Sequence, residues 1–321
     1  MEGLIGGEKN CISARIRHVV QAEVPRLARC AEYFFQPGVE GKRVRSSALL
    51  LMASALSPGG TADDPLEREK MLVPDLRPYN HYPEEVRRKQ QRIAEITEMI
   101  HVATLLHDDV LDDAETRRGI HSVNKMFGNK AAILAGDFLL AKASVALASL
   151  RNTEVLTLMA TVIENLVTGE MMQLSSSFSS AIGLGTTGTG SSAEDYFQKS
   201  FLKTASLFQN SCKSVALLGG ADAEVAELAG EYGRHLGLAF QIRDDVLDLS
   251  DDIAGGIPTL PVLLEPNDLD LGVAKTMEIA NRHSQLAMKA VDSFPAAESK
   301  HAQVCRDALK FLAHDLVKRK A

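Results

Sequence analysis

Five long stretches of the sequence repeat apolar residues at three- and four-residue steps, and this periodicity constrains the fold more than any other feature. Several of them are apolar on nearly every side, which is typical of central helices in a large bundle. Strand signals are scarce, because no Asn-Gly or Asp-Gly turn joins two apolar runs. We therefore predict an all-α helical bundle. The helical stretches are residues 92–118, 131–150, 154–174, 200–220 and 223–249.

Two stretches interrupt the helical pattern. Residues 57–83 are rich in Pro, Gly and Asp, and residues 175–193 are rich in Ser, Gly and Thr, so we expect loops in both places. Neither stretch flanks a change in the type of secondary structure. The 321 residues would suffice for two domains at ~150 residues each. We nevertheless predict a single domain over residues 1–321.

Composition excludes several classes of protein. A net charge of −7 argues against a nucleic-acid surface, because phosphate binding needs a basic field. The four cysteines are far apart and form no CxxC motif, so neither a zinc site nor a disulfide framework is indicated. The opening MEGLIGGEKN resembles neither a signal peptide nor a transit peptide, and no uninterrupted apolar run reaches the ~18 residues of a membrane span. We expect a soluble protein, cytoplasmic as given, or mitochondrial or plastid if a transit peptide has been removed.

The pentapeptide DDVLD occurs twice, at residues 108–112 and 244–248, each time near the end of an apolar helical stretch. Residues four apart lie on the same side of a helix, so Asp108 and Asp112 point the same way, as do Asp244 and Asp248. Like charges at this spacing repel, and something must offset the repulsion. Carboxylate oxygens suit Mg²⁺, which prefers a few carboxylates together with phosphate oxygens and water. The pattern predicts a site for a magnesium diphosphate.

Cationic residues near these clusters point to the same ligand. Arg117 and Arg118 follow the first DDVLD, and the segment GKRVR supplies Lys42 and Arg45. Lys203 lies in the apolar stretch SFLKTASLF, where a buried ammonium group needs an anion close to it.

The sequence contains, in order, GKRxR, IHxATLLHDDxxDxxxxRRG, GNKAAILAGDFLL, GE..QL, KTASLF and GLAFQxxDDxxD. From about Val19 to Asp248 it thereby resembles the trans-type isoprenyl (polyprenyl) diphosphate synthases. The resemblance implies the isoprenoid synthase fold, a single-domain helical bundle around a deep apolar cavity, and usually a homodimer. It also implies that three Mg²⁺ ions bind between two facing Asp-rich motifs and hold the diphosphate of an allylic primer.

The resemblance assigns residues to three binding sites. The metal ligands would be Asp108, Asp109, Asp112, Asp244 and Asp245, with Asp248 close by. Contacts to the allylic diphosphate would come from Arg117, Lys203, Thr204 and Gln241. Isopentenyl diphosphate would be held by Gly41, Lys42, Arg45, His101 and Arg118.

The implied reaction is the Mg²⁺-dependent condensation of isopentenyl diphosphate with an allylic diphosphate. Cleavage of the allylic carbon–oxygen bond leaves a carbocation and a diphosphate, so cations must stabilise the growing negative charge. The double bond of isopentenyl diphosphate then attacks the cation, and a proton is lost to the departing diphosphate. No protein nucleophile is required.

Product length depends on the residues before the first motif. In the family, positions four and five residues before it help form the cavity floor. Here these are Thr104 and Ala103, both small, and the next turn offers Ile100 and Met99. We expect a long-chain product of the solanesyl or decaprenyl type, while geranyl and geranylgeranyl products stay open.

The sequence departs from the family pattern after the second motif. The segment DLSDDIAGGIPTLPVLL lacks the usual lysine-containing loop, and the region after Pro266 is shorter than usual. GKRVRSS lacks a proline after its second arginine, and Arg243 replaces a residue that is usually uncharged.

Three alternative functions follow from the residues. The shortened carboxyl region is compatible with a weakly active or non-catalytic subunit of a heteromeric synthase. Two Glu-x-x-His segments, Glu98 to His101 and Glu298 to His301, could belong to a di-iron bundle. A terpene cyclase would also use DDxxD, but it would not need Lys42, Arg45 and His101.

Overall fold

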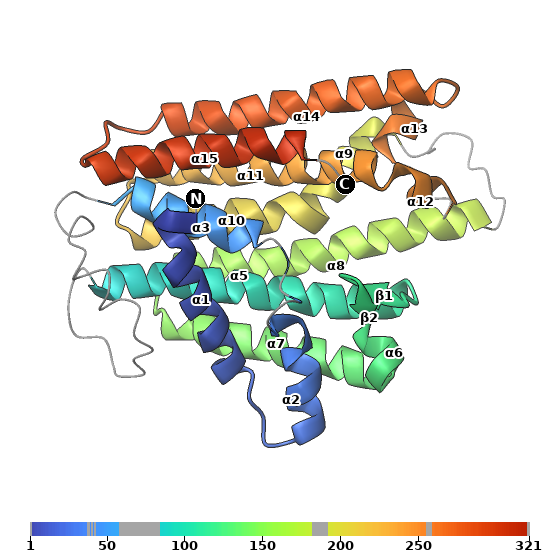
Figure 1. The fold of residues 1–321 in the computed structure, drawn as a ribbon, viewed down its shortest axis with the longest axis horizontal. Coiled ribbons are helices and arrows are strands. Elements are labelled where there is room, and N and C mark those ends of the chain that lie inside the picture. Colours follow the sequence, from blue (N-terminus) through green and yellow to red (C-terminus); the bar gives the residue numbers. More distant parts are fainter. Residues whose placement is uncertain are drawn as a thin grey trace. The chain divides into compact units, whose positions relative to one another are not determined.

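The computed structural model describes residues 2–36, 39, 41, 43–57, 84–181, 192–254 and 259–319. Within these residues the protein is built of helices and one small hairpin, so the all-α prediction is confirmed (Figure 1). Lys42 and nearly all of the expected loop 57–83 lie outside the described residues. The chain forms two compact units, Met1–Leu156 with Glu298–Cys305, and Thr157–Ala297 with Arg306–Ala321. A single domain, as expected from the sequence, stays a prediction.

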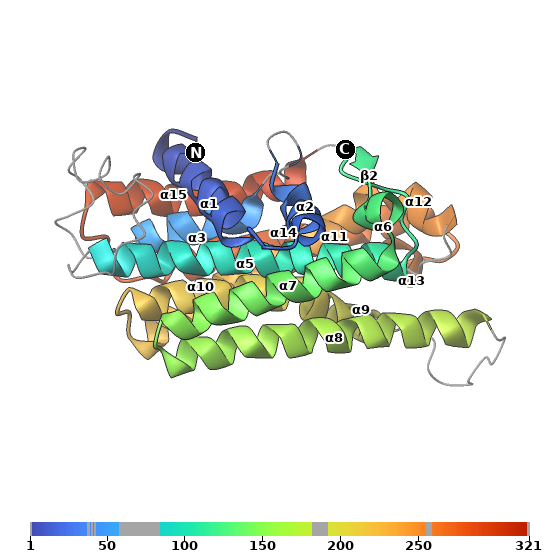
Figure 2. The same cartoon turned by 90° about the horizontal axis from the view of Figure 1, so that it is seen from below.

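The first unit is organised around α5, which packs against α3, α7 and α1. Figure 2 shows α5 and α7 side by side. Every residue of α3 from Ser46 to Ala55 is buried, as expected for a central helix. The elements are α1 (Glu2–Val19), α2 (Pro25–Glu32), η1 (Tyr33–Phe35), α3 (Val44–Ala55), α5 (Glu84–Leu111), β1 (Thr116–Arg117), β2 (Ile120–His121), α6 (Val123–Phe127) and α7 (Asn129–Ser149).

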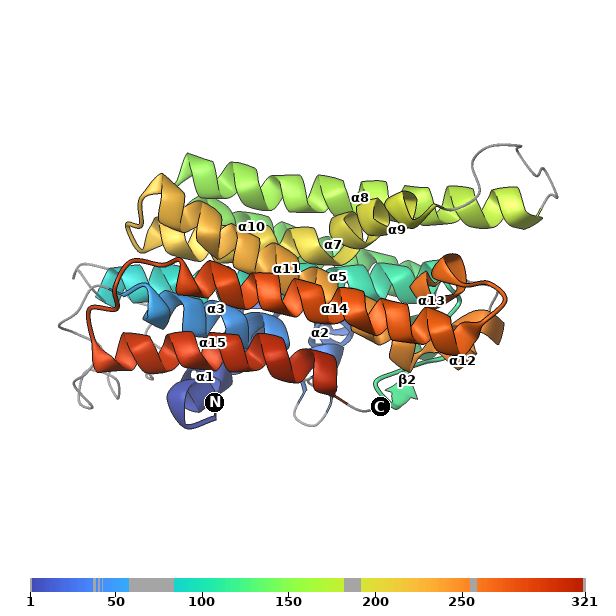
Figure 3. The same ribbon diagram turned by 90° about the horizontal axis from the view of Figure 1, so that it is seen from above.

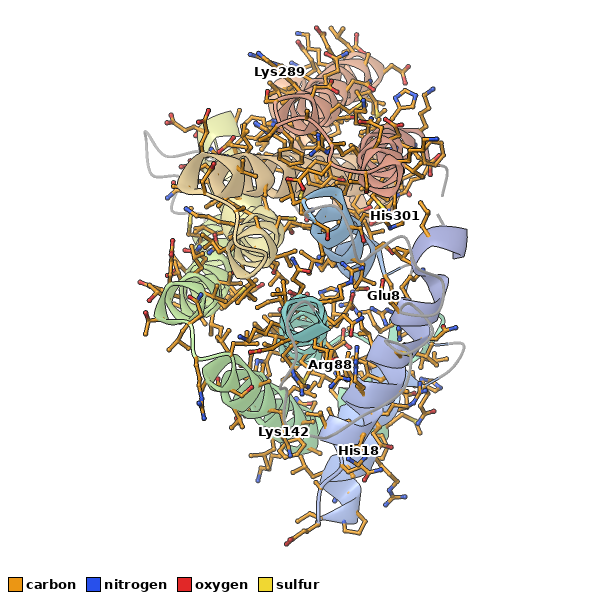
Figure 4. The ribbon with its side chains drawn as sticks, turned by 90° about the vertical axis from the view of Figure 1, so that its left-hand side faces the viewer. Glu8, His18, Arg88, Lys142, Lys289 and His301 are labelled. Atoms are coloured by element: carbon orange, nitrogen blue, oxygen red, sulfur yellow. The ribbon has the colours of Figure 1, made fainter. Side chains whose placement is uncertain are left out.

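A polar network ties α1 to α5. Arg87 donates from Nε and Nη2 to the two carboxylate oxygens of Glu8 at 2.8 and 2.7 Å. Figure 4 labels Glu8 on α1. Arg15 and Glu95 form a second ion pair at 2.7 Å. The pKa of Glu8 is lowered: burial opposes its charge, but Arg87 and hydrogen bonds to Arg87 and Gln91 outweigh burial.

The second unit is organised around α11, which packs against α10 and α14; Figure 3 shows α11 beside α14. Glycines permit the close packing, since a Cβ at Gly233 would lie 2.4 Å from the Phe208 carbonyl oxygen. The elements are α9 (Ala193–Ser200), η2 (Phe201–Ala205), α10 (Ser206–Leu218), α11 (Ala223–Leu247), α12 (Leu249–Ala254), α13 (Leu260–Leu264) and α14 (Leu269–Asp292). Two further helices, α8 (Thr153–Ala181) and α15 (Lys300–Lys318), have residues in both units.

Two predicted boundaries were wrong. The helix expected over residues 92–118 ends at Leu111, because Asp113 adopts a positive φ of 49° and the chain turns into the β1–β2 hairpin. The loop expected over residues 175–193 begins later, because α8 continues to Ala181, and α9 already starts at Ala193. The Ser-rich composition of residues 175–181 therefore did not stop the helix.

Two helices are long and apolar enough to cross a membrane by length and composition alone, α7 and residues Thr153–Leu174 of α8. The core helix of a soluble protein passes the same test. About two fifths or less of each stretch is buried, 39% of the first and 28% of the second. The expected absence of a membrane-spanning segment therefore stays a prediction.

Candidate functional site

The two copies of DDVLD occupy the same position on their helices. Both α5 and α11 end at the leucine of the pentapeptide, Leu111 and Leu247. The last aspartate still donates its backbone N–H to the first one four residues back, at 2.8 Å from Asp112 to Asp108 and 2.9 Å from Asp248 to Asp244. Each pair therefore keeps helical spacing and lies on one side of its helix end. The burial pattern is also the same, with the first aspartate half-buried, the second buried and the last exposed.

In the first copy, the inner aspartate holds an arginine from the hairpin. Asp109 is fully buried, and its Oδ1 accepts a hydrogen bond from Arg117 Nε at 2.7 Å and forms an ion pair with Arg117 Nη2 at 2.7 Å. Burial raises the pKa of Asp109, and the Arg117 guanidinium partly offsets the rise. The other oxygen, Oδ2, is buried without a hydrogen-bond partner among the residues the structure describes. Asp109 therefore keeps one oxygen that an added ligand can use.

The hairpin also positions Arg118 beside Gly41. Arg118 and Gly119 occupy the turn with φ of 54° and 77°. The Arg118 guanidinium donates to the Val39 carbonyl at 3.0 Å and lies 5.7 Å from the centre of the Phe34 ring. A Cβ on Gly41 would come within 3.0 Å of Arg118 Nη2, so the glycine leaves room for this arginine. Two of the predicted isopentenyl diphosphate contacts, Gly41 and Arg118, are thus neighbours.

Two more of these predicted contacts, Arg45 and His101, lie 3.2 Å apart between Nη1 and Nε2. Burial lowers the pKa of Arg45 to about 10, with Glu98 opposing the shift and Arg118 adding to it. Burial, and then Arg45, Arg118 and Arg117, hold the pKa of His101 well below its usual value. Three arginines thus act on one neutral imidazole, and such a cluster suits a multiply charged anion.

Glu98 stabilises the segment that carries Arg45. Its buried carboxylate accepts the backbone N–H of Ser46 at 3.2 Å, in the first turn of α3. The residue before this helix, Arg43, has a left-handed φ of 50°. Glu98 therefore accepts one of the first backbone N–H groups of α3, as a capping residue does.

The described residues contain no group of three or more His, Cys, Asp or Glu side chains arranged to hold a metal, which gives the di-iron alternative no support.

In the second copy, the inner aspartate is held by neutral donors. Asp245 Oδ1 accepts from Gln241 Nε2 at 2.9 Å, and Oδ2 accepts from the backbone N–H of Leu260 at 3.3 Å. Burial raises the pKa of Asp245, while hydrogen bonds from Gln241, Tyr196 and Leu260 lower it in part. The hydroxyl of Thr204 donates to Gln241 Oε1 at 2.8 Å. Thr204 and Gln241, both predicted to contact the allylic diphosphate, are thus hydrogen-bonded to each other.

Asp244, the outer aspartate of this copy, forms an ion pair with Arg319. Arg243 Nη2 donates to the carbonyl of Arg319 at 2.6 Å, and the Arg319 guanidinium lies 4.7 Å from the centre of the Phe240 ring. Arg243, which departs from the family pattern, therefore anchors the residue that neutralises Asp244.

Lys203 has the anionic partner that its apolar surroundings required. Its Nζ lies 2.5 Å from Glu170 Oε1 and donates to Gln173 Oε1 at 3.0 Å. Both partners belong to the GE..QL motif, and a Cβ on Gly169 of that motif would lie 2.7 Å from Lys203 Cγ. Lys203 lies in η2, a π-helical turn of the kind often found at functional sites.

The residues predicted to set product length lie on α5. Ile100 and Ala103 are buried, as is Met99. Thr104 is half-buried, and its hydroxyl donates to the His101 carbonyl at 2.8 Å. No bulky side chain occupies the two positions four and five residues before the first DDVLD.

The donor set at the helix ends fits magnesium rather than a softer metal. The outer aspartates offer carboxylate oxygens, and Asp109 offers one buried oxygen in addition. Mg²⁺ takes most of its ligands from phosphate and water.

Sequence analysis missed four residues of the site: Glu98, Glu170, Tyr196 and Arg319. Glu170 was within a quoted motif, so its pairing with Lys203 could have been found. The other three lie 49 to 75 residues from the residues they act on, which are Ser46 for Glu98, Asp245 for Tyr196 and Asp244 for Arg319, and periodicity gives no signal at that range.

Comparison with known proteins gives the same family on all counts. The family model described as polyprenyl synthetase matches residues 24–257. A rice (Oryza sativa subsp. japonica) protein named solanesyl-diphosphate synthase 1, mitochondrial, is 44% identical over 98% of this chain and 78% of its own length. Decaprenyl-diphosphate synthase subunit 1 of Schizosaccharomyces pombe is 43% identical over 81% of this chain and 70% of its own.

A solved structure extends the likeness to the fold. The apo form of a medium/long-chain length prenyl pyrophosphate synthase from Arabidopsis superposes with a TM-score of 0.72 at 38% identity, covering 99% of this chain and 98% of that one. The chain therefore belongs to the polyprenyl synthetase family of prenyltransferases and has its all-α isoprenoid synthase fold.

Proposed function

We propose that this protein condenses isopentenyl diphosphate with an allylic diphosphate in a Mg²⁺-dependent reaction that yields a long-chain polyprenyl diphosphate. The observation that carries the proposal is the cationic cluster of Arg45, Arg117 and Arg118 around a neutral His101 in the same unit as the first DDVLD. A diphosphate needs such a cluster, whereas a terpene cyclase has no second diphosphate to hold there.

The outer aspartates are the proposed metal ligands. Asp108 and Asp112 from the first copy, and Asp244 and Asp248 from the second, present carboxylates on one side of each helix end. Asp109 would add its unpartnered oxygen. When bound, Mg²⁺ ions, three as in the family, would neutralise the charge that grows on the leaving diphosphate.

Lys203, Thr204, Gln241 and Arg117 would bind the allylic diphosphate. Lys203, Gln241 and Arg117 can each donate a hydrogen bond to a phosphate oxygen. To bind the ligand, Lys203 would exchange Glu170 for it, and the Thr204 hydroxyl would exchange Gln241 Oε1 for it. Gly41, Arg45, His101 and Arg118, together with Lys42, would hold isopentenyl diphosphate. Positioning the double bond beside the allylic carbon is then the main task of these side chains.

The proposed product is long. Ala103 and Thr104 are small, and Ile100 and Met99 on the preceding turn are aliphatic, so no aromatic ring on this stretch of α5 would stop the growing chain. The names of the rice and fission yeast relatives, a solanesyl and a decaprenyl synthase, support the same length class.

The proposed assembly is a homodimer. On α7, Leu134 is 61% and Val145 71% exposed, and a second copy of this chain would cover such apolar side chains in an isologous contact. The name of the fission yeast relative, subunit 1, keeps a heteromeric synthase as the second candidate. The name of the rice relative supports a mitochondrial location.

The test is incubation of the purified protein with radiolabelled isopentenyl diphosphate, an allylic primer and Mg²⁺, followed by separation of the dephosphorylated products by length. We expect a ladder that ends at a long prenyl alcohol and disappears with EDTA. A folded protein that makes no product alone, but does so with a partner synthase subunit, would support the heteromeric candidate. Short products only would contradict the proposed product length.

A further inference from the structure

Asp245 differs from the aspartate next to it in what surrounds its carboxylate. It is 7% exposed, and each of its two oxygens accepts a hydrogen bond, Oδ1 from the Gln241 side chain and Oδ2 from the Leu260 backbone. Tyr196 on α9 lies beside this carboxylate and lowers its pKa in part. Three elements, α9, α11 and the start of α13, thus converge on one side chain. Both oxygens of Asp245 therefore have fixed donors, and the side chain is held in one orientation.

The same hydrogen bonds determine the orientation of the Gln241 amide. A carboxylate only accepts, so the atom of Gln241 that faces Asp245 must be the nitrogen. The amide oxygen then faces Thr204, and the Thr204 hydroxyl donates to it at 2.8 Å. The amide nitrogen carries a second hydrogen, and this hydrogen is not needed by Asp245.

A diphosphate is an acceptor, so a residue that binds it must offer a donor. Gln241 could offer either its oxygen or its nitrogen if the amide were free to turn, and the oxygen would repel the ligand. We propose that Asp245 is a positioning residue, held by the Leu260 N–H, which fixes the Gln241 amide with its free N–H available to the allylic diphosphate. This role rests on the proposed function and would replace the metal-ligand role that the family resemblance implies for Asp245.

A double-mutant cycle tests the proposal. Binding of inorganic diphosphate with excess Mg²⁺ is measured by calorimetry for the wild type, Asp245→Asn, Gln241→Ala and the double variant, with Asp244→Asn as the matched neighbouring control. We expect each single variant to bind about tenfold more weakly, which is the effect of one hydrogen bond to a charged group. We expect the double variant to bind no more weakly than Gln241→Ala, because Asp245 acts through Gln241.

Kinetics and metal binding separate positioning from ligation. Asp245→Asn should raise the KM for the allylic substrate with little change in kcat, and should leave Mn²⁺ binding without diphosphate unchanged. Asp244→Asn should lower both kcat and the affinity for Mn²⁺. The positioning role would be overturned if the two single losses of diphosphate affinity multiplied to about a hundredfold in the double variant. Weaker Mn²⁺ binding by Asp245→Asn would overturn it as well.

Two other results would also decide between the proposals. If circular dichroism shows that Asp245→Asn does not fold, Tyr196→Phe replaces it, since this variant removes the hydroxyl that acts on Asp245 and no carboxylate. It should weaken diphosphate binding about threefold, the lower end for one hydrogen bond, and unchanged binding would overturn the proposal. A folded wild-type protein that binds no magnesium diphosphate would instead overturn the proposed function, and with it the site that Asp245 prepares.

Discussion

The two DDVLD segments are identical in sequence and sit at the same place on their helices, but their surroundings differ. Asp109 pairs with the Arg117 guanidinium and keeps one oxygen without a partner among the described residues, whereas Asp245 uses both oxygens on uncharged donors. Asp244 is neutralised by Arg319. The comparison teaches that the role of each aspartate is set by the donors around it, and not by the pentapeptide alone.

The largest effects are expected at the outer aspartates. We predict that Asp108→Ala and Asp244→Ala each lower turnover by about two to three orders of magnitude, because each removes charge that stabilises the leaving diphosphate through the metal. Steady-state kinetics measures the loss, and circular dichroism confirms that the helices persist. Equal activity in wild type and either variant would remove the metal assignment for that copy.

The inner aspartates should differ in their contribution to stability. Arg117→Gln leaves the buried Asp109 without its ionic partner and should lower the free energy of unfolding by about 2 kcal/mol, a value reduced from that of a fully buried pair because the Arg117 side chain is 33% exposed. Tyr196→Phe removes a neutral hydroxyl that acts on Asp245 and should cost about 1 kcal/mol.

Urea unfolding measures both values. Lys125→Gln is the control, because its ion pair with Asp113 is exposed and should contribute almost nothing. If Tyr196→Phe lowered the free energy of unfolding by more than Arg117→Gln does, the distinction between the charged environment of Asp109 and the neutral one of Asp245 would fail.

A smaller effect is expected from Arg319. Its ion pair with Asp244 competes with a metal ion, so Arg319→Gln should tighten Mn²⁺ binding about threefold, the effect of a partly exposed ion pair. Lys318→Gln changes the charge equally at an exposed neighbouring position and serves as the control. Weaker Mn²⁺ binding by Arg319→Gln alone would show that this arginine assists the site.

The smallest expected effect is on how the stability of the fold depends on pH, through His101 on the helix that carries the first DDVLD. The folded-state pKa of His101 is lowered, so the unfolded chain binds more protons below the usual value of ~6.5, and stability should fall as the pH drops through that value. His101→Gln should lose part of this acid sensitivity. Thermal unfolding between about pH 7.5 and about pH 5.5 measures the slope. Identical slopes in both proteins would contradict the neutral assignment of His101.

Much of this architecture follows from local sequence patterns. The helix predicted over residues 131–150 corresponds to α7, and the one over residues 223–249 to α11, because continuous apolar periodicity needs no distant partner. The four-residue spacing of Asp108 and Asp112 also predicted that both lie on the same side of α5. The end of α5 at Leu111 was missed, since a positive φ at Asp113 has no strong signal in the sequence.

The roles of the inner aspartates could not be predicted in the same way. Asp245 is held by the Leu260 backbone, fifteen residues away, and by Tyr196 on another helix. Such contacts depend on how helices pack, and side-chain identity alone does not reveal them. The resemblance to a family assigned both DDVLD copies one role, and the structure gives their inner aspartates different partners.

The most direct test of this account is a crystal structure with Mn²⁺ and inorganic diphosphate bound, in which anomalous scattering locates the ions. We predict ions at ligand distance, about 2.2 Å, from oxygens of the outer aspartates Asp108 and Asp244, with the Asp245 carboxylate still bonded to Gln241 and the Leu260 N–H. An ion bound directly to Asp245, or none at either DDVLD, would contradict it.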